Sequence, residues 1–157
     1  MKQEEGSERS LPERIADSLE RFATEDECLL GTAAPGSGVN VVPLSVAWID
    51  SAFVFCTRRA TRTASNLRAS PLARIVYGSP ADIVLVDVEI ETCEITDLAP
   101  TLVDGYTRHV NWDISEENDD YVALVGTPIK IRAWRRESEM TLMRDGRWLE
   151  VAFRTDT

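Results

Sequence analysis

The stretch from Ile83 to Thr96 constrains the fold more than any other part of the sequence, because its apolar and polar side chains alternate. Its apolar members are Val84, Val86, Val88 and Ile90, and the acids between and after them are Asp87, Glu89 and Glu91. Successive side chains of a β-strand point to opposite faces of a sheet. The pattern therefore predicts a long strand with one face in a core and the other in water.

Shorter strand-like segments separated by turn residues account for much of the remaining chain. Val39–Ile49 is strand-like, Asp50-Ser51 predicts a hairpin tip, and Ala52–Thr57 predicts the returning strand. Two further strands, Tyr121–Val125 and Ile129–Trp134, are predicted on either side of a turn at 126–128.

A hairpin is also predicted near the C-terminus. Its strands are Met140–Met143 and Trp148–Phe153, and Asp145-Gly146 lies between them. Asp-Gly between two strand-like segments is a strong signal for a two-residue turn.

Three helices are predicted as connections. The first covers about 12–24, where Ser10 can cap, Pro12 sits early enough to need no N–H, and Glu13 completes a capping box. The other two are predicted at Thr61–Ala69 and Leu98–Trp112. Because most connections between the strands are short, the sheet is expected to be antiparallel. Seven or eight strands in about 125 residues predict a mainly β fold with connecting helices, closed or nearly closed into a small barrel.

The chain of 157 residues is long enough for one domain. We expect a disordered N-terminal lead over residues 1–9 and a single domain over residues 10–157. The N-terminus is polar and acidic and lacks the apolar segment of a secretory signal, which favours a cytoplasmic location. No apolar stretch has the length of a membrane span, so no membrane partner is expected.

The overall charge is strongly acidic, with a formal net charge of −10. Such a surface argues against nucleic acid and anionic membranes as partners. The three cysteines are far apart and only His109 could join them, so neither a disulfide framework nor a metal site is expected. We interpret the acidic run Asp113–Asp120 as a solvated loop.

The basic residues are concentrated in one window. Residues 51–81 contain no acid but hold Arg58, Arg59, Arg62, Arg68 and Arg74. Hydroxyls and guanidinium groups at the start of a helix make a good cradle for a phosphate, because the helix N-terminus offers free N–H groups. The alternative is a solvated basic helix face whose arginines pair with acids elsewhere in the chain.

The sequence contains no self-sufficient catalytic set. There is no G-x-S-x-G, no G-x-G-x-x-G before a helix and no Walker motif. His109, the single histidine, is expected at a surface or an interface rather than as a general base. We therefore expect a β-barrel that binds a phosphorylated ligand and takes its chemistry from a cofactor.

Four segments carry a resemblance to a known family: Val41–Trp48, Phe53–Thr57, Thr61–Leu67 and Ser70–Ala73. In their order and spacing they resemble the flavin-binding split β-barrels, which include the pyridoxamine-phosphate-oxidase-like proteins and the related flavin/deazaflavin oxidoreductases. The C-terminal run Pro128–Trp134, followed by 144–148, is similar to the closing strands of this family. The resemblance covers about residues 24–150.

The resemblance implies a fold, an assembly and a cofactor. The fold is a six-stranded antiparallel split barrel with extra strands and helices, and the assembly is a two-fold homodimer with flavins in clefts at its interface. The implied activity is that of an oxidoreductase that uses FMN to act on a small-molecule substrate. One alternative is a reductase that uses a 5-deazaflavin coenzyme, and another is a non-enzymatic module that binds flavin or haem.

The resemblance also implies which residues bind the cofactor. The strand Val41–Val46 would run along the isoalloxazine ring, Arg62 and Thr63 would meet the phosphate, and Trp134 would reach the flavin from the partner subunit. The complete implied set is Val42, Pro43, Leu44, Ser45, Cys56, Thr57, Arg58, Arg59, Arg62, Thr63, Asn66 and Trp134. No catalytic residue is assigned.

Two positions depart from the pattern of the family. Thr63 stands where the family usually has Lys, and Arg58 or Arg59 could supply the missing charge. True pyridoxamine phosphate oxidases have an Arg-x-His pair after the tryptophan, whereas the stretch Glu137–Thr141 holds no histidine. The second departure predicts that the protein does not oxidise vitamin B6.

Overall fold

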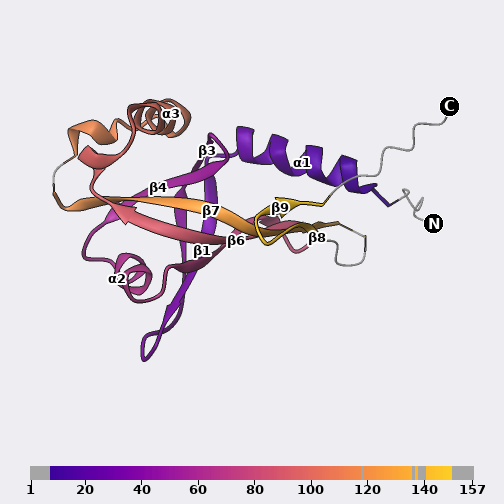
Figure 1. The fold of residues 1–157 in the computed structure, drawn as a ribbon, viewed down its shortest axis with the longest axis horizontal. Helices are drawn as coiled ribbons and strands as arrows, with labels where there is room; N and C mark the ends of the chain where they lie inside the picture. Colours follow the sequence, from indigo (N-terminus) through magenta and orange to yellow (C-terminus); the bar gives the residue numbers. More distant parts are fainter. Residues whose placement is uncertain (1–7, 118, 136, 138–140, 150–157) are drawn as a thin grey trace.

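The computed structural model describes residues 8–117, 119–135, 137 and 141–149. In this part of the chain, an antiparallel sheet curls into a half-barrel and three α-helices lie around it (Figure 1). The predicted fold class, a mainly β split barrel with connecting helices, is confirmed.

The described residues form nine strands, more than the seven or eight predicted. The strands are β1 Glu27–Ala34, β2 Gly38–Ser45, β3 Ala47–Ile49, β4 Ala52–Arg58, β5 Leu72–Ser79, β6 Asp82–Cys93, β7 Tyr121–Trp134, β8 Thr141–Arg144 and β9 Arg147–Trp148. The helices are α1 Leu11–Thr24, α2 Arg62–Ala69 and α3 Pro100–Val110, with short 3-10 helices η1 Ile95–Asp97 and η2 Ile114–Glu116.

The sheet order is β2-β1-β5-β6-β7-β4-β3, and β8 pairs with both β7 and β9. β2 and β3 lie at opposite ends of this order, although only Val46 separates them in the chain. The prediction of one strand over Val39–Ile49 was therefore wrong. Its first part pairs with β1 and its last part pairs with β4, so the chain must bend at Val46 to serve both. The bend curls the sheet back on itself.

β7 is a single long strand, which corrects the prediction of two strands around a turn at 126–128. It pairs with β6 from Ala123 to Trp134, but its register shifts so that Asp87 faces Lys130 and Val88 faces Pro128. Ile129 is the extra residue of this β-bulge. Because proline cannot donate to a ladder, a bulge is one of the few places where a central strand accepts it.

Other elements agree with the prediction. In β6 the side chains of Val84, Val86, Val88 and Ile90 are buried, as their alternation predicted. Asp145 and Gly146 both have positive φ and form the predicted two-residue turn between β8 and β9, while residues 150–153 of the predicted hairpin lie outside the described residues. The helix predicted over Leu98–Trp112 is shorter at both ends: α3 begins at Pro100 and ends at Val110, where Asn111 takes a left-handed conformation.

α1 covers the core of the half-barrel and begins with the predicted capping box. The Ser10 hydroxyl accepts from the Glu13 N–H, and the Glu13 carboxylate accepts from the Ser10 N–H at 2.7 Å. Phe22, near the end of the helix, is fully buried, and its ring centroid lies 5.3 Å from Trp48 and 5.0 Å from Phe53. This aromatic contact fixes α1 on the inner face of the sheet.

β4 is buried on both faces and separates two cores. Phe53 and Phe55 belong to the core of the half-barrel, whereas Val54 and Cys56 pack toward α3 with Tyr106. Since both faces of β4 are fixed by packing, the residues at its C-terminal end are held in place from both sides.

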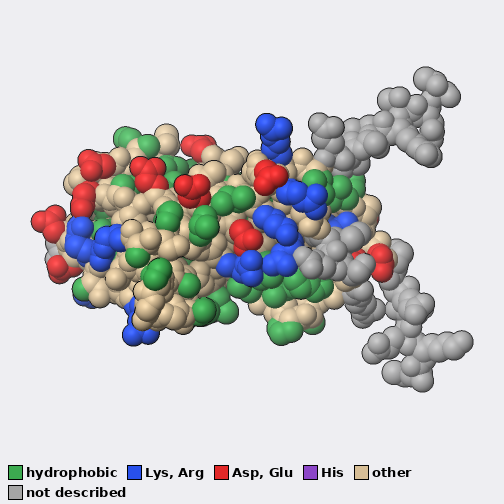
Figure 2. Space-filling model, turned by 60° about the horizontal axis from the view of Figure 1, so that its bottom comes forward, with side chains coloured by type: hydrophobic (Ala, Val, Ile, Leu, Met, Phe, Trp, Pro, Cys, Tyr) green, Lys and Arg blue, Asp and Glu red, His purple; other side chains and the backbone are tan. Residues whose placement is uncertain are grey.

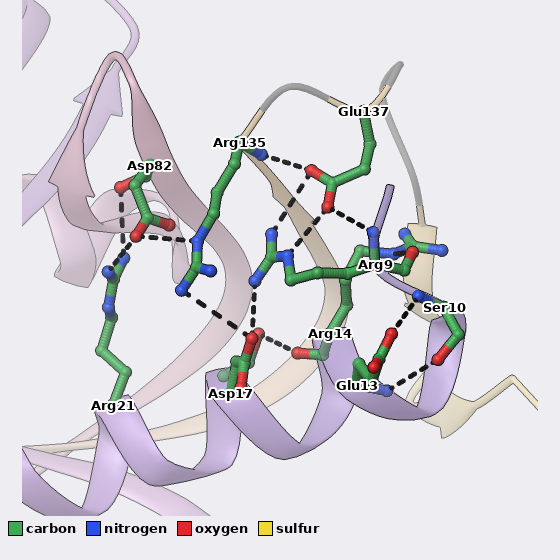
Figure 3. Close-up of polar contacts among 10 residues, drawn as sticks. Arg9, Ser10, Glu13, Arg14, Asp17, Arg21, Asp82, Arg135 and Glu137 are labelled. Atoms are coloured by element: carbon green, nitrogen blue, oxygen red, sulfur yellow. Dashed lines mark hydrogen bonds and ion pairs between the residues drawn. The ribbon is translucent and has the colours of Figure 1, made fainter. Parts of the chain in front are cut away.

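A network of charged side chains joins the start of α1 to the end of β7 (Figure 3). The buried Glu137 carboxylate accepts from the Arg9 Nε at 2.8 Å, from the Arg9 N–H at 3.1 Å and from the Arg135 N–H at 2.6 Å. Arg9 also pairs with Asp17 of α1 at 3.0 Å. Arg9 is the last residue of the predicted disordered lead. Residues 1–7 lie outside the described residues, so the lead stays a prediction.

We expect Glu137→Gln to lower the free energy of unfolding by about 2–4 kcal/mol at pH 7, because it removes the charge that these donors bind. The hydrogen bond from the Arg9 guanidinium is the main reason that the pKa of Glu137 lies well below its usual range. A carboxyl whose pKa is lowered in the native state stabilises the fold at pH values above its ordinary pKa of 4.5. This stabilisation is lost as the pH falls below 4.5.

Urea unfolding between pH 7 and pH 3 measures this effect. The difference between Glu137→Gln and the parent should shrink as the pH falls. Glu20→Gln, which changes an exposed acid on α1, serves as the control and should cost less than about 0.5 kcal/mol. Equal stability of the parent and Glu137→Gln at pH 7 would show that the network contributes nothing.

None of the described helices combines the length and the apolar character that crossing a membrane requires.

Candidate functional site

A pocket of about 440 Å³ opens at the C-terminal end of β4, and we name it the β4-end pocket. Its lining comes from the start of β1, the end of β2, the end of β4, the residue before α2, and the segment from α3 to the start of β7. The lining residues are Glu27, Pro43, Leu44, Ser45, Cys56, Thr57, Arg58, Thr61, Tyr106, Trp112 and Tyr121.

Six of the predicted cofactor-binding residues meet in this pocket. They are Pro43, Leu44, Ser45, Cys56, Thr57 and Arg58. They come from two strands that the sheet order separates, and the bend at Val46 brings the end of β2 close to β4. Val42, also predicted, lies on β2 next to Pro43 but is not part of the lining.

The polar end of the pocket is formed by Thr57, Arg58 and Thr61. Thr61 is the N-cap of α2, and its hydroxyl accepts from the Ala64 N–H at 3.2 Å and donates to the Arg58 carbonyl at 2.9 Å. The exposed Arg58 guanidinium lies over the Tyr121 ring, 5.2 Å from its centroid. A hydroxyl, a guanidinium and the start of a helix are the groups that bind phosphate.

Arg62 lies in the first turn of α2 with its side chain exposed. The structure gives it no hydrogen-bond or ion-pair partner within the described residues. Arg74, in contrast, pairs with Asp87 at 2.6 Å. This pair is what the alternative interpretation, a solvated basic face whose arginines pair with acids elsewhere, predicted for all the arginines of the window. The basic window is therefore divided between paired arginines and arginines that are not paired with acids.

Arg59 is the most extensively bonded arginine of the basic window. Its Nη1 and Nη2 donate to the two carboxylate oxygens of Glu94 at 2.8 and 2.6 Å, and its Nε donates to the Asp119 carbonyl at 2.9 Å. Its backbone N–H donates to the Asp120 carbonyl at 2.6 Å. The structure thus turns this predicted cofactor-binding side chain toward Glu94 rather than into the pocket.

Thr63 and Asn66 face the sheet. The Thr63 hydroxyl accepts from the Asn40 amide at 3.1 Å, and the Asn66 amide donates to the Thr32 hydroxyl at 3.1 Å. Both side chains are buried. They fasten α2 to β1 and β2 and do not line the β4-end pocket.

Trp134 lies at the other end of β7 from the pocket. It pairs with Ile83, whereas Tyr121, at the start of β7, lines the pocket. A single chain therefore does not bring Trp134 to the pocket, and its role of reaching a flavin from a partner subunit stays a prediction.

An aromatic wall closes one side of the pocket, and the sequence analysis missed it. It consists of Tyr106, Trp112 and Tyr121; the Trp112 ring centroid lies 5.4 Å from Tyr121 and 6.3 Å from Tyr106. The Trp112 indole N–H donates to Glu117 at 2.7 Å, which fixes the ring. No local motif marks these residues, because they come from α3, the segment after it and β7.

Tyr106 is fully buried against Cys56 of β4. Burial is the main cause that raises the pKa of Tyr106, and a backbone hydrogen bond with Cys56 acts in the opposite direction. The hydroxyl oxygen is itself buried, so Tyr106 shapes the wall of the pocket and we assign it no bond to a ligand.

Cys56 and His109 are poor candidates for catalysis. Burial, with a smaller contribution from Glu117, raises the pKa of the Cys56 thiol to about 12, which leaves almost no thiolate at neutral pH. The His109 Nε2 lies 2.9 Å from the Glu25 carbonyl and joins α3 to the end of α1. Among the described residues no group of three or more metal-binding side chains was found.

A second hollow, of about 590 Å³, lies on the outer face of β1, β2 and β5. We name the surface around it the outer apolar face, defined by four exposed side chains: Leu29 at 43%, Val39 at 80%, Val41 at 57% and Leu72 at 57%. Figure 2, which brings the β1–β2 hairpin toward the reader, shows hydrophobic side chains on this side of the molecule among smaller groups of charged ones. Large exposed apolar patches are typical of surfaces that bind another molecule.

Comparisons of sequence gave no match to a family model and none to a curated protein. Comparisons of structure gave many matches at low identity. The fold resembles a pyridoxamine 5'-phosphate oxidase-related, FMN-binding protein from Nostoc punctiforme (13% identity, TM-score 0.57, covering 81% of this chain and 93% of that one). It also resembles an F420 reductase (17% identity, TM-score 0.56, covering 71% and 94%).

A third similar structure is HutZ, a heme storage protein from Vibrio cholerae (13% identity, TM-score 0.61, covering 83% of this chain and 97% of that one). At these identities the comparisons show the fold, which is the split barrel expected from the sequence resemblance. These three structures are described as an FMN-binding protein, an F420 reductase and a heme storage protein.

Proposed function

We propose that the protein is an FMN-dependent oxidoreductase of the pyridoxamine-phosphate-oxidase-like type, with the coenzyme bound in the β4-end pocket. The observation that carries the proposal is that six residues predicted from β2 and β4 meet in one pocket. The FMN-binding protein with the same fold supports it.

The residues present fit a flavin. The phosphate would lie at the polar end, near Thr57, Arg58 and Thr61, with Arg62 exposed one residue beyond. The isoalloxazine would lie along Pro43–Ser45, whose backbone offers hydrogen-bonding groups.

FMN, when bound, supplies the hydride-transfer chemistry. The protein's own residues bind and orient: the arginines and hydroxyls hold the phosphate end, and the backbone of β2 sets the position of the ring. The aromatic wall excludes water on one side of the pocket. Since the Cys56 thiol stays protonated and His109 lies outside the lining, we assign no acid–base residue.

A homodimer is part of the proposal. The outer apolar face is continuous with the pocket region through β2, since Val39 and Val41 lie in the same strand as Pro43 and Ser45. Burying this face against a second copy would remove exposed valine and leucine side chains from water. The approach of Trp134 to the flavin of the partner, which the family resemblance implies, belongs to the same proposal.

The protein is not expected to oxidise pyridoxamine phosphate. Glu137, the first residue of the stretch that lacks the Arg-x-His pair, is already bound by Arg9 and Arg135, and 138–140 lie outside the described residues. Assayed with FMN and saturating pyridoxamine phosphate, the protein should form no pyridoxal phosphate above the rate of free FMN. Saturable turnover would contradict this reading.

The runner-up is a reductase that uses a 5-deazaflavin coenzyme. Within the part of the chain that the structure describes, neither Arg58 nor Arg62 is paired with an acid, so both could bind the phosphodiester and acidic tail of such a coenzyme. The F420 reductase with the same fold favours it. A third candidate is a non-enzymatic flavin or haem module, in line with the heme storage protein.

Titration decides between these candidates. FMN, the deazaflavin coenzyme F420 and haem are each added to the purified protein, and binding is followed by flavin fluorescence, deazaflavin fluorescence and the Soret band. Tight binding of FMN alone supports the first choice. Binding of F420 or haem in its place would overturn it.

A further inference from the structure

Arg59 connects three separate segments of the chain. Its guanidinium binds Glu94, which follows β6, and its Nε and backbone N–H bind the Asp119 and Asp120 carbonyls before β7. Its own carbonyl accepts from the Arg68 Nη2 of α2 at 3.4 Å. We name this group of contacts the Arg59 clamp.

The clamp lies between the polar end and the aromatic wall of the β4-end pocket. Arg58, immediately before Arg59, and Thr61, two residues after it, form the polar end of the pocket. Tyr121, immediately after Asp120, belongs to the aromatic wall and carries the Arg58 guanidinium over its ring. A shift of the clamp would therefore move both ends of the pocket relative to each other.

The clamp makes more hydrogen bonds than an ordinary ion pair at a protein surface. Exposed ion pairs contribute little on average, but a bidentate arginine–carboxylate pair within a network is the exception. Pairing raises the pKa of Arg59 and lowers the pKa of Glu94, so both groups stay charged. The two backbone carbonyls add bonds that do not depend on an acid.

We propose that Arg59 is a positioning residue, which acts through Glu94 and the carbonyls of residues 119 and 120 to hold Arg58 and Thr61 in place for the phosphate of the coenzyme. This inference rests on the proposed function. The proposal and simple charge arguments predict opposite effects for the replacement of Glu94. On charge alone, removing an acid near an anion site strengthens anion binding. If Glu94 holds Arg59 in the clamp, its removal weakens anion binding instead.

The test compares FMN with riboflavin, which lacks the phosphate, in Arg59→Ala, Glu94→Gln and the double variant. Each single variant should bind FMN about 5- to 20-fold more weakly than the parent. The double variant should bind FMN no more weakly than the single variant with the lower affinity, because both substitutions break the same contact. Riboflavin affinity should change less than about twofold in all three, because the phosphate contact is what the clamp positions. Arg59→Lys should not restore binding, because lysine lacks the planar fork.

Glu91→Gln is the matched control. It removes an exposed acid from the same segment, outside the clamp, and should leave FMN binding unchanged or slightly tighter. If Glu94→Gln binds FMN as tightly as Glu91→Gln does, or more tightly, the clamp does not position the phosphate site. If only Arg59→Ala weakens binding and Arg59→Lys restores it, Arg59 touches the phosphate directly and the inference is wrong.

Hydrogen exchange separates failure of the clamp from failure of the proposed function. If the parent protein binds neither FMN nor F420, the proposed function is overturned, and the clamp is then judged without ligand. Amides over residues 58–64 should exchange faster in Arg59→Ala and Glu94→Gln than in Glu91→Gln. Equal exchange in the three variants would overturn the clamp itself.

Discussion

Val41→Glu is expected to convert the proposed dimer into a monomer at micromolar concentration. Val41 is exposed in the single chain and lies on the outer apolar face, opposite Gly31 of β1. A two-fold interface contains every substitution twice, so two unpaired carboxylates would be buried. We expect a cost of about 3 kcal/mol or more, equivalent to at least about a 150-fold rise in the dissociation constant.

Sedimentation of the parent, Val41→Glu and a control measures this effect. The parent should be a dimer whose interface buries about 2,000 Å² or more. Ala16→Glu, which adds the same charge to an exposed position on α1, should remain dimeric. A monomeric parent, or a Val41→Glu variant that stays dimeric, would show that the outer apolar face is not the interface.

Arg62→Ala is expected to weaken FMN binding by about 1.5–3 kcal/mol, or roughly 10- to 150-fold. Arg62 is exposed at the start of α2 and has no partner among the described residues, so its guanidinium can bind a phosphate without breaking another contact. Thr63, where the family usually has Lys, is buried against Asn40. The charge on Arg62 is therefore not duplicated by its neighbour.

The measurement is a fluorescence titration with FMN, and riboflavin is titrated in parallel. Arg108→Ala, which removes the same charge from an exposed position on α3, is the control and should bind FMN as the parent does. The thermal stability of the ligand-free protein should hardly change, because the Arg62 side chain makes no described contact. Unchanged FMN affinity in Arg62→Ala would place the phosphate elsewhere.

Local pattern predicted the elements whose neighbours are also local. β6 was predicted because apolar and polar side chains alternate along it, which shows which face meets the core. α1 was predicted because Ser10 and Glu13 cap it through hydrogen bonds within one turn. The basic window was found because it is a contiguous stretch without acids. These signals depend only on residues close together in the chain.

What the sequence analysis missed depends on contacts between distant segments. The residues on either side of Val46 are equally strand-like, and only their pairing with β1 or β4 separates them. Pro128 reads as a turn residue, although pairing with Val88 keeps it in a strand with a bulge. The aromatic wall joins the pocket only because β4 and β7 are paired, and nothing near Tyr106 in the sequence records that pairing.

The pairing of β4 with β7 also has a consequence for how the protein folds. It joins residues 53–58 to residues 121–126, so it closes one of the long loops of the chain, whereas the hairpins of β1 with β2 and β3 with β4 are local. Closing a long loop costs entropy that only later contacts repay, which makes such pairings slow and late. The β4-end pocket takes its lining from both strands, so a chain in which β4 and β7 are unpaired lacks the arrangement that lines it. A coenzyme that binds this pocket would therefore stabilise the chain in which the two strands are paired.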